Sequence, residues 1–147
     1  MLPDDQLTEQ GVLLVTGATL RAEQVDRPLA YQLKTAIENR LAARLSAPKV
    51  VVLSDLWYLN AEALHKLPLI SVGGPGVNAV SAHLFRRLPS VLVVDDRLLI
   101  QMDLNLDDLR ASVWGANHEL TVNALEIFTS RGYLDHFLDA VVARCES

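Results

Sequence analysis

Residues 70–78 read Ile70-Ser71-Val72-Gly73-Gly74-Pro75-Gly76-Val77-Asn78, an apolar run that ends in a glycine-rich turn. Short apolar runs that are bounded by Gly or Pro are typical of buried strands. The segment from Val77 to Leu88 is predicted to be a helix. The turn therefore leaves a strand and opens a helix, which is the local arrangement of α/β proteins.

Two earlier apolar runs have the same character. Val12–Val15 is followed by Thr16-Gly17-Ala18-Thr19, and Val50–Leu53 is followed by Ser54-Asp55. Strands that are apolar on both faces belong to parallel sheets that helices cover on both sides. We therefore expect these runs to be central strands of one sheet.

An amphipathic helix is predicted between these two strands. Leucine or isoleucine recurs every four residues from Leu29 to Leu45, a spacing that places the side chains on one helix face. Pro28 is expected in the first helical turn, and Ser46-Ala47-Pro48 is expected to end the helix. Asn60 is expected to cap a further short helix.

The C-terminal half predicts an antiparallel edge. Pro89–Val94 and Leu98–Met102 are two strands too close together for a parallel crossover, so a hairpin is expected. A short strand at Ser112–Trp114 and helices at 118–131 and 134–142 follow. The whole order predicts one α/β domain over residues 1–147, with 1–10 as a flexible lead-in. Its fold is expected to be a three-layer, mostly parallel, Rossmann-like or flavodoxin-like sheet with helices on both faces.

Composition narrows the functional classes. The net charge is −5, and ten Arg residues are scattered along the chain, so no nucleic-acid partner is expected. One cysteine, Cys145, cannot form an internal disulfide, and the histidines have no metal-ligand spacing. No apolar run approaches the ~18 residues of a membrane span, and no signal peptide is recognisable. We expect a cytoplasmic protein without a membrane partner or a metal.

A candidate site is expected where the strand order reverses. In open α/β sheets, ligands bind there, beyond the carboxyl ends of the strands. In a flavodoxin-like order the first and third strands are neighbours, so their two glycine-bearing loops should face each other across a crevice. The candidate ligand-binding residues in these loops are Thr16, Gly17, Thr19, Gly73, Gly74, Gly76 and Asn78.

The turn at Gly73–Asn78 has two interpretations. Glycines let backbone N–H groups approach a ligand, and the helix N-terminus behind them attracts an anion such as phosphate or carboxylate. Alternatively, the turn only connects a strand to a helix. Its spacing matches neither the dinucleotide fingerprint nor the phosphate-binding P-loop, so no cofactor is identified.

Three further segments allow both a ligand-binding and a structural role. Trp114 could stack on a ligand, Asn117 contact it and His118 act as a general base. Structurally, Trp114 is core, Asn117 is an N-cap, Glu119 favours the first-turn dipole and His118 is exposed. Asp55 is either a polar ligand contact and acid/base candidate or a cap. The stretch Arg21–Arg27, with Glu23, Asp26 and Arg27, is either a solvated face or a ligand clamp.

The Gly-Gly-Pro-x-x-Asn pattern of Gly73–Asn78 resembles the glycine-rich segment of archaeal surface-layer-type α/β modules. Trp114-Gly115 and Thr121-Val122-Asn123-Ala124 are similar to the later motifs of those modules. The resemblance implies a Rossmann-like sheet and no enzymatic activity. The chain departs from the pattern in lacking an export signal, so a surface location is not implied.

Three functions follow from these observations. The first is a non-catalytic module that binds a small anionic ligand or a protein partner, because no complete catalytic set is present. The second is a small enzyme for a phosphorylated or nucleotide-like substrate, with His118 or Asp55 as acid/base. The third is an assembly module, a homo-oligomer that associates through Trp57, Tyr58 or the C-terminal helices.

Overall fold

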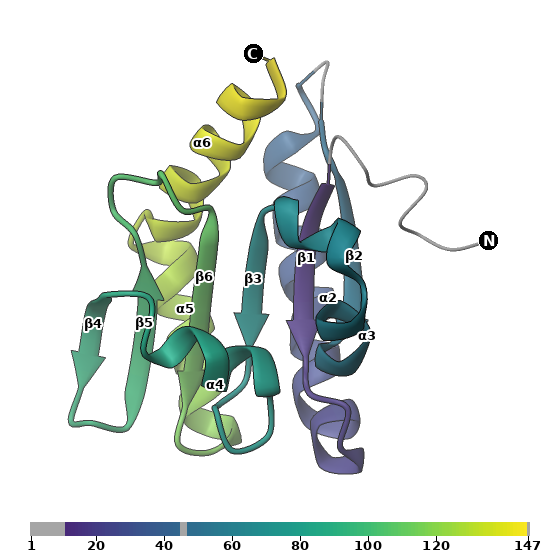
Figure 1. Ribbon diagram of the computed structural model, residues 1–147. Coiled ribbons are helices and arrows are strands. Elements are labelled where there is room, and N and C mark those ends of the chain that lie inside the picture. The colour runs from purple at the N-terminus through teal and green to yellow at the C-terminus, as the bar shows by residue number, and fades with distance from the viewer. Residues whose placement is uncertain (1–10, 45–46, 147) are drawn as a thin grey trace.

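The computed structural model describes residues 11–44 and 47–146, so the expected lead-in and the predicted helix end at Leu45 and Ser46 lie outside it. A six-stranded sheet has the order β2-β1-β3-β6-β5-β4 (Figure 1). The strands are β1 (Gly11–Thr16), β2 (Lys49–Ser54), β3 (Leu69–Val72), β4 (Ser90–Val94), β5 (Leu98–Met102) and β6 (Arg110–Gly115). The helices are α2 (Leu20–Leu41), α3 (Asp55–Asn60), the 3-10 helix η1 (Glu62–Lys66), α4 (Ala79–Phe85), α5 (His118–Ser130) and α6 (Tyr133–Glu146).

The sheet is mixed and mostly parallel, as the sequence predicts. β1 pairs in parallel with both β2 and β3, and β3 pairs in parallel with β6. β5 runs antiparallel to both β6 and β4, so the predicted hairpin forms the edge. Every residue of β1 and β3 is buried, because helices cover both faces of the parallel strands.

Two hydrophobic cores lie on the two faces of the sheet. Val12 and Leu14 of β1 face the core that α2, α5 and α6 complete. Leu13 and Val15 point the other way, to the core formed with α3, η1 and α4. Figure 1 shows α3 and α4 on one side of the sheet and α2, α5 and α6 on the other. The alternation follows from the two-residue side-chain period of a strand.

The helix α2 differs from its prediction at both ends. It begins at Leu20 because the Thr19 hydroxyl accepts a hydrogen bond from the N–H of Ala22 and caps the helix. Pro28 therefore lies inside the helix instead of in its first turn. Its interior position costs about 3 kcal/mol, which burial of the apolar stripe offsets. The described helix ends at Leu41, before the predicted limit.

Two smaller predictions were also wrong. Asn60 does not cap a helix: it ends α3, and its amide donates to the carbonyl of Leu56. The N-cap of α3 is Ser54. The next helix, η1, has Ala61 at its N-cap position, without a side-chain cap. The helix predicted over 77–88 is shorter, because Asn78 caps it and Val77 remains in the turn.

Candidate functional site

The two glycine-bearing loops touch directly. A Cβ built on Gly17 would lie 1.8 Å from the carbonyl oxygen of Val77. This side-chain-free contact lets the loop after β1 pack against the turn after β3. The adjacency of the loops is as expected, but no crevice separates them at this point.

Asn78 connects the ends of β1 and β3 through its side chain. Its amide nitrogen donates to the carbonyls of Val15 and Val72 at 3.2 and 3.0 Å and to the Ser71 hydroxyl at 3.0 Å. Its side-chain oxygen caps α4 by accepting hydrogen bonds from the N–H groups of Val80 and Ser81. Because Asn78 is buried and its polar atoms are occupied, its geometry is that of a structural residue.

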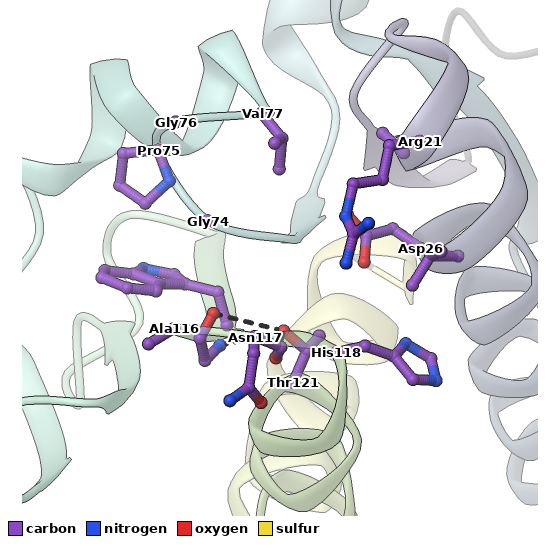
Figure 2. Close-up of a pocket in the computed structure, with 14 residues that line it drawn as sticks. Arg21, Asp26, Gly74, Pro75, Gly76, Val77, Ala116, Asn117, His118 and Thr121 are labelled. Carbon is purple, nitrogen blue, oxygen red and sulfur yellow. Dashed lines mark hydrogen bonds between the residues drawn. The ribbon is translucent and has the colours of Figure 1, made fainter.

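A pocket of about 270 Å³ lies beside this contact (Figure 2). Three segments line it: Arg21, Ala22, Val25 and Asp26 of α2, the turn Gly74–Val77, and residues 114–118 with Thr121 at the start of α5. Among the sequence candidates, the pocket brings together Gly74, Gly76, Trp114, Asn117 and His118. It does not include Thr16, Gly17, Thr19, Gly73, Asn78 or Asp55.

The N-terminus of α5 borders the pocket, and its cap leaves some backbone N–H groups free. The Asn117 side chain accepts from the N–H of Leu120 at 2.9 Å, so its predicted N-cap role is confirmed. The Thr121 hydroxyl donates to the carbonyl of Asn117 at 3.1 Å and fixes the cap. The first N–H groups of the helix, at His118 and Glu119, have no intrahelical acceptor and form its positive end.

Asp26 forms the buried polar part of the pocket. Its side chain extends from α2 into the hollow beside Arg21, as Figure 2 shows, yet the residue is only 7% exposed. No hydrogen bond to its carboxylate is found among the described residues. Burial raises the pKa of Asp26, and the charges of His118 and Arg21 oppose that shift. The solvated-face interpretation is therefore wrong for Asp26. It fits Glu23 and Arg27, which form a partly exposed ion pair at 3.7 Å.

Trp114 supports the glycine-rich turn. A Cβ on Gly74 would lie 3.4 Å from Cε3 of Trp114, so the turn rests on the indole. The ring of Phe85 lies 6.3 Å away, centroid to centroid. The indole is half-buried, and its Nε1 is buried without a hydrogen-bond acceptor among the described residues. The ring lines the pocket and also supports the turn Gly74–Val77, which forms another part of the lining.

Asp55 has a structural position away from the pocket. One carboxylate oxygen accepts from the N–H of Leu56 at 2.7 Å, and the other accepts from the N–H of Ala79 at 2.8 Å. The side chain thus ties the start of α3 to the start of α4. Of the two acid/base candidates, only His118 lies at the pocket, where it is joined by Asp26.

Within residues 11–44 and 47–146, no group of His, Cys, Asp and Glu is arranged to hold a metal ion. None of the helices in that part of the chain has the length and apolar character needed to cross a membrane. No family model, curated protein or solved structure matches the chain.

Proposed function

We propose that this protein is a binding module whose pocket takes a small ligand carrying both an anionic group and a hydroxyl or amine donor. The observation that supports this most directly is the Asp26 carboxyl. It is buried in the pocket wall with no hydrogen bond among the described residues. Its carboxylate oxygens are not among the fully buried unpaired atoms of the described residues, so they are reachable from the pocket. A ligand hydroxyl or amine that reaches Asp26 would supply the missing hydrogen bond.

The anionic part of the ligand is inferred from the groups around Asp26. The N-terminus of α5 offers free N–H groups and a partial positive charge. Arg21 and His118 line the same pocket and bring a guanidinium and an imidazole. A phosphate or carboxylate would therefore be attracted to the His118 side, while its donor group meets Asp26.

The size of the pocket supports a small ligand. Its volume of about 270 Å³ lies just below the usual range of about 300–1,000 Å³ for ligand sites. A sugar phosphate or a hydroxycarboxylate agrees with both the volume and the charges. We extend the proposal to the fold type: the order β2-β1-β3 supports a flavodoxin-like sheet, with the pocket beyond the carboxyl end of β3.

A small enzyme for a phosphorylated substrate is the second candidate. It is supported by the presence of His118 and Asp26 in the lining of the same pocket and by the raised pKa of Asp26, which suits a proton donor. The residues described around the pocket include no Ser or Cys, and the Thr121 hydroxyl is occupied in the helix cap. Binding without chemistry is therefore the better-supported proposal.

A thermal-shift screen tests the proposal. Ribose phosphate, glycerol phosphate and lactate provide an anion with a donor group, while inorganic phosphate and ribose each provide one half. We expect the combined ligands to raise the melting temperature more than either half, and Asp26→Asn to reduce that difference. Glu23→Gln, on the same helix but outside the pocket lining, is the matched control. Equal shifts for all probes in the wild type and in Asp26→Asn would contradict the proposal.

A further inference from the structure

The strand β4 leaves one edge of the sheet open. It is the last strand in the order and pairs only with β5, and Figure 1 shows no helix beyond it. Val93 and Val94 are 48% and 40% exposed. A free strand edge carries unpaired N–H and C=O groups and can pair with another strand.

The sequence of β4 lacks most features that block such pairing. Ser90–Val94 contains no charged residue and no proline, and a short irregularity lies only at its start, between Ser90 and Leu92. The opposite edge strand, β2, begins with an exposed lysine and has a mostly buried interior. Of the two edge strands, β4 therefore has the larger exposed apolar surface.

The ends of β4 carry opposite charges. Arg86 and Arg87 precede the strand, while Asp95 and Asp96 follow it and Arg97 closes the turn. In an antiparallel pair of two β4 strands, the first end of one copy lies beside the second end of the other. The doubly positive segment would then meet a turn with net charge −1, at both ends of the pair.

We infer that two copies of this chain associate through antiparallel pairing of their β4 strands, about a two-fold axis near Leu92. A two-fold interface uses the same surface on both copies and closes without further growth. The two sheets would become one continuous sheet. A second copy is favoured because it pairs the exposed backbone, covers Val93 and Val94, and brings the oppositely charged ends together.

Analytical ultracentrifugation of the full chain over a wide concentration range tests the inference. We expect a reversible dimer in the wild type. Val93→Lys should shift the protein to monomer, because lysine opposes edge pairing, whereas Val93→Thr, which keeps the β-branched shape, should retain the dimer. Asp95→Asn combined with Asp96→Asn should weaken the dimer and reverse its salt dependence, because the turn would then have a net charge of +1 opposite the two arginines. Asparagine is chosen because it tolerates the positive φ of this turn.

Circular dichroism melting shows that each variant is folded. The Asp95→Asn, Asp96→Asn variant changes no residue within β4, so it tests the interface even if Val93→Lys does not fold. A wild type that stays monomeric at every concentration would overturn the inference. A folded Val93→Lys that dimerises like the wild type would also overturn it.

Discussion

The α-carbon of Gly73 lies directly against the carboxylate of Asp26: a Cβ at position 73 would be 2.6 Å from Oδ2. Gly73 also has a φ of +106°, which side-chain-bearing residues rarely adopt. The glycine at the end of β3 thus gives the Asp26 side chain room beside the turn. This relationship joins the fold to the proposed site, because it places a buried carboxyl from α2 next to the loop after β3.

Gly73→Ala is expected to destabilise the protein by about 2–4 kcal/mol, from backbone strain and from collision with Asp26. Urea denaturation measures this loss. Gly76→Ala is the matched control, because a Cβ there would meet no atom within 4 Å. Equal unfolding free energies for the two variants would contradict both the strain at the positive φ and the collision with Asp26.

Asn78→Ala is expected to cost about 2–4 kcal/mol, because it removes an N-cap and leaves buried backbone groups without partners. The comparison is Asn117→Ala, which removes one cap hydrogen bond at an exposed position. That variant should cost about 1 kcal/mol. Chemical denaturation of both proteins gives the ranking, and a larger loss for Asn117→Ala would contradict the role assigned to Asn78.

Asp26 should make stability depend on pH in a defined direction. Burial raises its pKa above the ordinary value of 3.8, against the opposing charges of His118 and Arg21. A raised carboxyl pKa contributes stability that is fully present below the unfolded pKa and is lost as pH rises through the folded pKa. Asp26→Asn carries no ionisable group there, so its stability relative to the wild type should increase from acid to neutral pH.

Urea unfolding of Asp26→Asn and the wild type at several pH values checks this direction. Glu23→Gln removes a partly exposed carboxylate from the same helix, and its difference from the wild type should stay small, as for other exposed ion pairs. A difference between Asp26→Asn and the wild type that does not change with pH would contradict the assigned cause.

Asp55→Ala should lower stability by about 2–3 kcal/mol, because it leaves the N–H groups of Leu56 and Ala79 without their acceptor. We expect its ligand-induced thermal shifts to match those of the wild type, since Asp55 lies outside the pocket lining. Loss of the ligand shift in a folded Asp55→Ala protein would return Asp55 to the binding site.

Local patterns were sufficient to predict most of the elements. The continuous apolar run Val12–Val15 predicts a strand buried on both faces, and every residue of β1 is buried. The close spacing of β4 and β5 predicts their hairpin, which is confirmed. Pro28 misplaced the start of α2, because a proline is common in a first turn but a Thr19 cap and tertiary packing determined the true start.

The site was only partly predictable, because its geometry depends on contacts between distant segments. The α5 cap at Asn117 is a local signal and was found. Asp26 carries no local sign that it is buried: the packing of α2 beside Gly73 excludes it from solvent. The contact of Gly17 with Val77 likewise depends on how closely two backbones approach, which spacing along the chain does not encode.

The most direct test of the proposed pocket is an NMR titration of backbone amides with ribose phosphate, comparing the wild type, Asp26→Asn and Glu23→Gln. The account predicts chemical-shift changes that centre on the amides of Gly74, Gly76 and His118. The affinity for ribose phosphate should fall several-fold in Asp26→Asn and stay unchanged in Glu23→Gln. Saturable shifts that centre elsewhere, or no shifts with ribose phosphate, glycerol phosphate and lactate alike, would contradict it.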